Sequence, residues 1–298
     1  MIQNGVLNCG VGAVGTWFDG CKNTPKEYVK IFLLSPLANI DLTSDTFTAE
    51  DRGLLIKKGW LVPLNDILQV TEAGAKTNVQ TLPNKREIFV SNGLLKFTAE
   101  MEANICLVKS LHVLSKKKWQ IILLDSEGKF FFDSKGGKLN GFEVQSFVVD
   151  NETTNDGGSK VATVSVSMQL TQNGTQGFNE RRSFLLSDEF YDVVGIQDVI
   201  LSSVSLVHTT LKVKVLGGCD KSTPITGLST ENFRVQNAST GAAESITVVD
   251  NGDGTYSISG ASAGDVVIQL YDSVLHLPVA DIENTQFYQS NPLVETLT

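Results

Sequence analysis

The feature that most constrains the fold is the strict alternation of apolar and polar residues in KVATVSVSMQLTQ. Between its apolar positions stand the small polar residues Thr163, Ser165, Ser167 and Gln169. A period of two over this length predicts a β-strand with one apolar face and one polar face. The preceding segment NGFEVQSFVVD is predicted to pair with this strand, as an antiparallel hairpin over residues 140–172.

Other patterns also predict a mainly β protein. The segment WQIILLDSEGKFFF predicts two short strands around a turn, and REIFVSNGLLKFTAEME predicts two strands joined by a tight turn at Asn92 and Gly93. Helices are predicted in TAEDRGLLIKKGW and in EANICLVKSLHVLSKKK, where apolar residues recur at helical spacing. The segment over 179–203 also has a helix-like rhythm.

The length of 298 residues allows two domains, each with an apolar core. We expect residues 1–205 to form a β-sandwich or β-barrel with one or two helices, the long hairpin and an irregular N-terminal arm. Residues 206–298 show short strands about every ten residues, a spacing typical of a β-sandwich. The stretch after Leu277 lacks a pattern, and we expect a C-terminal tail there.

Charge and cysteine content exclude several classes of protein. The net charge of −9 disfavours binding to nucleic acid or anionic lipid through neutralised phosphates. No signal peptide is recognisable, and the apolar runs are too short to span a bilayer. The four cysteines contain no Cys-x-x-Cys pair, so we expect no zinc site, and we expect free thiols. Whether Cys9 pairs with Cys21 stays open.

Two glycine-rich motifs suggest ligands but lack the necessary context. GVGAVG over residues 10–15 has the glycine spacing of a dinucleotide site, yet no strand precedes it and no helix can follow it. DNGDGT over residues 250–255 has a glycine where a calcium loop needs an oxygen ligand, and Ala263 where it needs a glutamate. We interpret the first as a turn-rich arm and the second as a hairpin turn.

No catalytic, metal-binding or cofactor-binding residue is predicted. His112, His208 and His276 are far apart in the sequence, and neither a His-x-x-x-His pair nor a Gly-x-Ser-x-Gly elbow is present. Arg181 and Arg182 are candidates for ion pairs between subunits, with a solvated surface as the equal alternative. The polar faces and the irregular arm favour a subunit that assembles with copies of itself, rather than an enzyme.

The hairpin NGFEVQSFVVDNETTNDGGSKVATVSVSMQL, the segment WQIILLDSEGKFF and the closing ITGLSTENFRVQ and DNGDGTYSISG resemble a bacteriophage tail tube protein, also called a major tail protein. The last two motifs resemble bacterial and phage immunoglobulin-like repeats, which places an immunoglobulin-like domain at residues 206–298. The first 200 residues or so resemble the family by strand pattern.

The resemblance implies a structural virion protein, made in the host cytoplasm, that forms hexameric rings stacked into a tube. Its partners are copies of itself, other tail or neck proteins, and DNA that passes through the lumen during ejection without sequence-specific binding. Thr163, Ser165, Ser167 and Gln169 are then expected to face the lumen or a neighbouring ring.

Three alternatives remain open. Another virion role, such as a neck ring or a head decoration, uses the same kinds of surface. A carbohydrate-binding or cell-surface-binding adhesin module would use the C-terminal sandwich, through Phe233, Tyr256 or Tyr271. An enzyme would need side chains from distant segments, such as the histidines, to meet.

Overall fold

The computed structural model describes residues 25–38, 40–41, 48–74, 78–91, 93–150, 153, 161–185, 193–207 and 210–297. Strands hold 52% of the residues and helices 13%, so the expected mainly β fold is confirmed. The described residues form two compact units, the first within 1–48 and 60–192 and the second within 49–59 and 193–298. The second unit is therefore discontinuous in sequence and begins before the expected boundary at residue 206.

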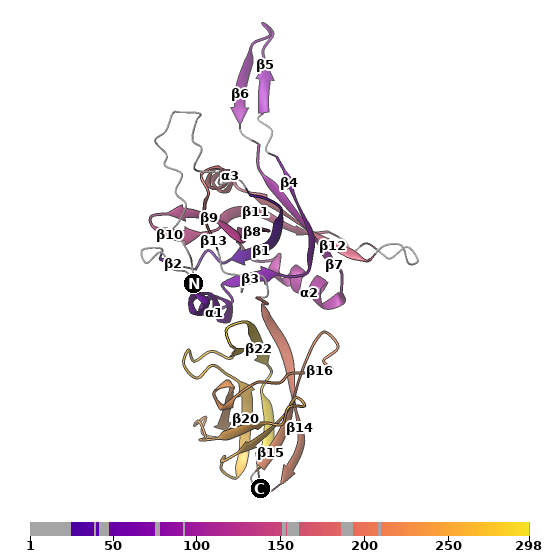
Figure 1. Ribbon diagram of the computed structural model, residues 1–298, viewed down its shortest axis with the longest axis vertical. Helices are drawn as coiled ribbons and strands as arrows, with labels where there is room; N and C mark the ends of the chain where they lie inside the picture. The colour runs from indigo at the N-terminus through magenta and orange to yellow at the C-terminus, as the bar shows by residue number, and fades with distance from the viewer. Residues whose placement is uncertain are drawn as a thin grey trace. The chain divides into compact units, whose positions relative to one another are not determined.

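The first unit consists of an 11-stranded curved sheet, a separate two-stranded ribbon and two helices (Figure 1). Its elements are β1 (Tyr28–Leu34), β2 (Ile40–Asp41), β3 (Leu61–Leu64), β4 (Ile67–Ala73), β5 (Asn78–Thr81), β6 (Glu87–Ser91), β7 (Lys96–Glu102), α2 (Ile105–Leu114), β8 (Gln120–Asp125), β9 (Lys129–Lys135), β10 (Lys138–Asn140), β11 (Phe142–Val149), β12 (Thr163–Leu170), α3 (Gln172–Asn179) and β13 (Arg182–Leu185).

The large sheet runs in the order β2-β10-β9-β8-β11-β12-β7-β4, with β1 and β13 paired to β8 and β9, and β3 paired to β1. Strand β11 changes partner along its length. Phe142 and Glu143 pair with β8, whereas Val144 to Val149 pair with β12. The sheets of the fold include a half-barrel, and the first unit has an apolar core of its own.

Aromatic rings fill that core. The ring of Phe97 packs edge-on against Tyr28 and Phe178, with centroids 5.9 and 5.4 Å apart, and Phe142 packs in the same way on Phe178. Such edge-to-face pairs stabilise a core beyond the area that they bury. The apolar residues of β12, from Val164 to Leu170, are fully buried in the same cluster, so the alternation in this strand is confirmed.

Helix α3 lies against the sheet because two of its residues are glycines. A Cβ atom on Gly174 would lie 2.3 Å from the carbonyl oxygen of Glu143, and one on Gly177 would lie 2.7 Å from the Asp133 carboxylate. Thr171 caps the helix by accepting a hydrogen bond from the Gly174 N–H at 2.9 Å. The glycines thus allow the close approach that brings Phe178 into the core.

The second unit is a β-sandwich with one helix. Its elements are α1 (Ala49–Lys57), β14 (Ile196–Val207), β15 (Thr210–Gly217), β16 (Thr223–Pro224), a 3-10 turn η2 (Thr230–Asn232), β17 (Phe233–Asn237), β18 (Thr247–Asp250), β19 (Thr255–Ser259), β20 (Gly264–Leu270), β21 (Ala280–Ile282), β22 (Gln286–Ser290) and β23 (Leu293–Leu297). One sheet contains β18-β19-β15-β14-β22-β21 with β16, and the other contains β17-β20-β23. Both sheets supply one core, which includes Val213, Val235, Tyr256 and Ile268.

Several predicted elements are confirmed. The structure contains the helices at α1 and α2, the strand pair β8 and β9, and the antiparallel pair β11 and β12. The DNGDGT segment is a hairpin turn between β18 and β19, in which Gly252 and Gly254 both have a φ of 79°.

Other predictions were wrong. The helix-like rhythm over 179–203 belongs instead to strands β13 and β14, because pairing with β9 and β15 outweighs the local pattern. No strand was predicted over residues 61–73, but this segment forms β3 and β4. Strands β6 and β7 do not pair with each other across Asn92 and Gly93; β6 pairs with β5, and β7 pairs with β4 and β12. The expected C-terminal tail forms β21, β22 and β23 of the sandwich.

We predict that Gly174→Ala destabilises the protein by about 2 kcal/mol, because the new methyl group must displace the Glu143 backbone. At a solvent-exposed position inside a helix, the same change would stabilise the helix by about 1 kcal/mol. Urea unfolding measures the difference. Gly74→Ala is the control, since nothing lies within 4 Å of a Cβ atom there. Equal stability of the two variants would contradict the close approach of α3.

Candidate functional site

The candidate site is the outward face of β7 and β12, which we call the polar face: Thr98, Glu100, Thr163, Ser165, Ser167 and Gln169. The register places Ser165 opposite Glu100, Ser167 opposite Thr98 and Gln169 opposite Lys96. All four polar residues predicted from the alternation therefore lie on one face of one strand. The other face of β12 is buried in the core.

Side-chain hydrogen bonds link the polar face across strands. The Thr163 hydroxyl donates to the Glu100 carboxylate at 2.9 Å, and the hydroxyls of Thr98 and Ser167 are 3.5 Å apart. Three of the four predicted residues are partly exposed, whereas Ser167 retains only 8% of its exposure. The face therefore presents small polar side chains, some of which are hydrogen-bonded across the strands.

Among the described residues, β4 at one end of the sheet and the part of β11 beyond Glu143 each have a partner strand on one side alone. Strand β4 pairs only with β7, and β11 beyond Glu143 pairs only with β12. Leu68 on β4 is 58% exposed, and Val148 on β11 is 50% exposed. Unpaired main-chain groups beside exposed apolar side chains can pair with a strand of another chain. No strand was predicted at β4, because most of its residues are exposed and it lacks an alternating pattern.

The ribbon of β5 and β6 is a second candidate contact surface. It is a two-stranded sheet by itself, and Val79 and Ile88 on it are 49% and 44% exposed (Figure 1). An isolated two-stranded hairpin is at best marginally stable in water. Burial against another chain would stabilise it.

The two arginines predicted for ion pairs between subunits have different surroundings. The guanidinium of Arg181 lies 4.6 Å from the ring centre of Phe178 and 5.8 Å from that of Phe131, and it donates a hydrogen bond to the Phe178 carbonyl. Arg181 thus packs within its own subunit. Arg182 lies on β13 opposite Phe132. The ion pairs between subunits stay a prediction for both arginines.

Nothing in the described residues brings the histidines together. His112 is exposed on α2 in the first unit, and His276 lies in a turn of the second unit with a φ of 56°. His208 lies outside the described residues. Within the part of the chain that the structure describes, no group of three or more His, Cys, Asp or Glu side chains could hold a metal ion. No described helix has the length and apolar character needed to cross a membrane.

The aromatic residues named for glycan contact are mostly inside the sandwich. Phe233 and Tyr256 are buried, with ring centroids 5.2 Å apart. The Tyr256 hydroxyl donates to the Ile225 carbonyl at 2.8 Å and accepts from the Leu228 N–H at 3.3 Å. Burial raises the pKa of Tyr256 to about 12. Tyr271 is partly exposed and stacks with Arg234.

The cysteines differ from the expectation. Cys106 and Cys219 are disulfide-bonded, so the prediction of free thiols was wrong for these two. Cys9, Cys21 and the GVGAVG motif lie outside the described residues.

No protein-family model matches the chain, and no curated protein matches it. The candidate site is therefore described by its own geometry alone.

We predict that Tyr256→Phe lowers the free energy of unfolding by about 1–3 kcal/mol, because the buried Ile225 carbonyl and Leu228 N–H lose their partner. Thermal or urea unfolding checks this. The control, Tyr271→Phe, is expected to change stability by less than about 0.5 kcal/mol. A Tyr256→Phe variant as stable as the native protein would contradict the buried hydroxyl.

Proposed function

We propose that this chain is a structural subunit that assembles with copies of itself into stacked rings, forming a phage tail tube through which DNA passes. The observation that carries the proposal is the four-stranded segment β4-β7-β12-β11, which combines two unpaired edges with one polar face. The resemblance of the sequence to tail tube proteins supports the same function. Hexameric rings are the expectation from that resemblance.

The two edges differ in sequence, so pairing between them is heterologous. Strand β4 of one subunit would pair with β11 of the next, and the same contact would repeat around the ring. The unpaired main-chain groups at both edges would then be satisfied, and Leu68 and Val148 would be buried. A closed ring leaves no free edge.

The chemistry of the polar face suits the wall of a conduit. Hydroxyl and amide side chains interact with water on the inside of a barrel. The partly buried Glu100 and the exposed Glu102 add negative charge, and Lys96 is the opposing basic residue in the same strand. A wall without a basic stripe does not retain the phosphate backbone of DNA in transit.

The β5-β6 ribbon supports contacts beyond a single subunit. Its exposed apolar residues Val79 and Ile88 gain burial if the ribbon packs on a neighbouring copy. We place this contact between subunits of the proposed tube. The sandwich of the second unit would then be an outer domain, as the resemblance to immunoglobulin-like repeats implies.

The structure supplies no observation that favours an adhesin. Two of the three aromatic residues suggested for glycan contact, Phe233 and Tyr256, are buried. Glycan binding through them would require the core of the sandwich to open.

We predict that the purified chain forms rings or tubes with a central hole. Negative-stain microscopy, with light scattering over a range of concentrations, tests this. A monomer at every concentration would overturn the proposal. Discs without a hole would support assembly and exclude a conduit.

We further predict that Leu68→Asp or Val148→Asp abolishes assembly and leaves the subunit folded, because each places a charge at a proposed interface where the side chain is now exposed. Circular dichroism checks the fold, and light scattering checks the mass. The matched control is Val294→Asp, at a residue that is 62% exposed in the second unit. If all three variants assemble like the native chain, the edges of β4 and β11 are not the interface.

A further inference from the structure

Helix α1 belongs to a different unit from its neighbours in the sequence. Strands β2 and β3, on either side of it, are part of the first unit, whereas residues 49–59 belong to the second unit with 193–298. The chain therefore enters the second unit for this one helix and then returns to the first. The contacts that hold α1 on the sandwich therefore also hold the chain connection through residues 49–59 in place.

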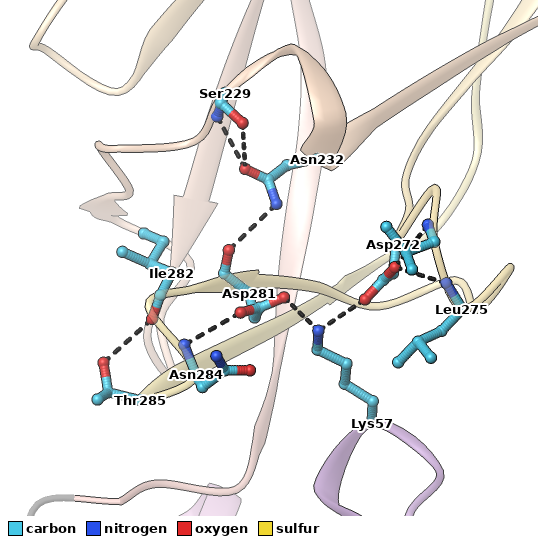
Figure 2. A network of polar contacts seen from close by, with 10 residues as sticks. Lys57, Ser229, Asn232, Asp272, Leu275, Asp281, Ile282, Asn284 and Thr285 are labelled. Atoms are coloured by element: carbon cyan, nitrogen blue, oxygen red, sulfur yellow. Dashed lines mark hydrogen bonds and ion pairs between the residues drawn. The ribbon is translucent and has the colours of Figure 1, made fainter. Parts of the chain in front are cut away.

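The last residue of α1, Lys57, holds it to the sandwich through two carboxylates. Its Nζ atom lies 2.6 Å from an oxygen of Asp272 and 2.5 Å from an oxygen of Asp281 (Figure 2). The exposed fractions of the three side chains are 8%, 8% and 17%. We call this arrangement the Lys57 clamp. In such a buried group, removal of the ammonium leaves two like charges facing each other without compensation.

Local hydrogen bonds within the sandwich also hold both carboxylates. The second oxygen of Asp272 accepts from the N–H groups of Val274 and Leu275 at 2.9 and 2.8 Å. Figure 2 shows this turn beside the lysine.

Asp281 is held in a similar way. Its second carboxylate oxygen accepts from the Asn284 N–H at 3.1 Å, and its main-chain carbonyl accepts from the Asn232 side chain, also at 3.1 Å. Both carboxylates that bind the Lys57 ammonium, those of Asp272 and Asp281, thus belong to the sandwich.

The helix depends on this docking. It has nine residues, which is fewer than the 12–15 or so that an isolated helix needs for stability in water. Gly53 within it lowers the helix propensity further. A Cβ atom at Gly53 would lie 2.6 Å from the Asn284 side-chain oxygen. The helix therefore also approaches the turn that follows Asp281, whose carboxylate accepts the Asn284 N–H.

A cavity of about 500 Å³ lies beside the clamp. It is also lined by Glu50 and Asp51 of α1 and by Glu231 of η2, so further carboxylates line the same cavity as Lys57. Water and protons therefore have access to the clamp. Burial lowers the pKa of Lys57, but the hydrogen bonds to the two aspartates outweigh it and the pKa is raised.

We propose that α1 is a releasable strap, which docks on the sandwich through the Lys57 clamp and detaches as a unit when the clamp loses its charge balance. Detachment lets the nine residues lengthen from about 14 Å as a helix to about 30 Å as an extended chain. The chain connection through residues 49–59 thereby becomes longer without unfolding of the sandwich. This device does not depend on the proposed tube function.

Hydrogen exchange of the full chain, followed by mass spectrometry near neutral pH, tests the strap. In Lys57→Met, we expect exchange across residues 49–59 to accelerate about tenfold or more, while β15 and β20 keep their native protection. Lys58→Met is the control, since it removes the neighbouring exposed lysine and leaves the clamp intact. Asp281→Asn provides a second test if Lys57→Met does not fold, with a smaller acceleration in the same segment.

Two results would overturn the proposal. One is native protection of residues 49–59 in both clamp variants. The other is simultaneous loss of protection in α1 and in the sandwich strands, which would make the clamp a part of the general stability of the unit.

Acid is expected to weaken the clamp. Burial raises the pKa of Asp272, but the hydrogen bonds from Lys57, Leu275 and Val274 outweigh it, so the pKa lies below its ordinary value of 3.8. Its contribution to stability is therefore present above that ordinary value and is lost as the pH falls through the lowered pKa. The urea midpoints of the native chain and of Asp272→Asn should differ at neutral pH and converge in acid. A constant difference across this range would contradict the charged state of the clamp.

Discussion

The fold of the first unit depends on the burial of one face of β12. Val164, Val166, Met168 and Leu170 are fully buried there, and the aromatic rings from β1, β7 and α3 pack into the same cluster. Because side chains alternate along a strand, this burial fixes which residues face outward. The outward position of Thr163, Ser165, Ser167 and Gln169 is thus a direct consequence of the core, and a shift of register by one residue would exchange the two faces of β12.

Sequence patterns predict the fold well where one strand carries its own signal. The alternation in β12 and the apolar runs in β8 and β9 are such cases, since each strand buries a defined face. Strand β4 lacks this signal because five of its seven residues are exposed at the edge of the sheet. Strand β14 has Ile200 and Val204 exposed and Val199 and Leu201 buried, and this mixture imitates helical periodicity.

The assignment of α1 to the second unit is beyond what local sequence can provide. The capping residues and terminal charges of TAEDRGLLIKKGW predict that it is a helix, and they do so correctly. Its place is decided by the pairing of Lys57 with Asp272, which is 215 residues away in the sequence. Likewise, alternation around Tyr256 identifies a strand, but only the carbonyl of Ile225 and the N–H of Leu228 explain why a tyrosine can be buried there.

In the proposed assembly, one feature of the subunit would determine where two copies touch, and another would determine how many copies a ring contains. The proposed contact between β4 and the free part of β11 is heterologous, and such a contact alone generates either a ring or an open helix. The rotation between successive copies decides between them, and it arises from the twist and curvature of the sheet. In this chain β11 passes from pairing with β8 to pairing with β12 at Glu143 and Val144. That point also contacts Gly174 of α3, whose missing side chain lets the helix rest on the Glu143 backbone. In the proposed assembly, the packing of α3 on this corner would be one feature of the subunit that influences whether copies close into a ring.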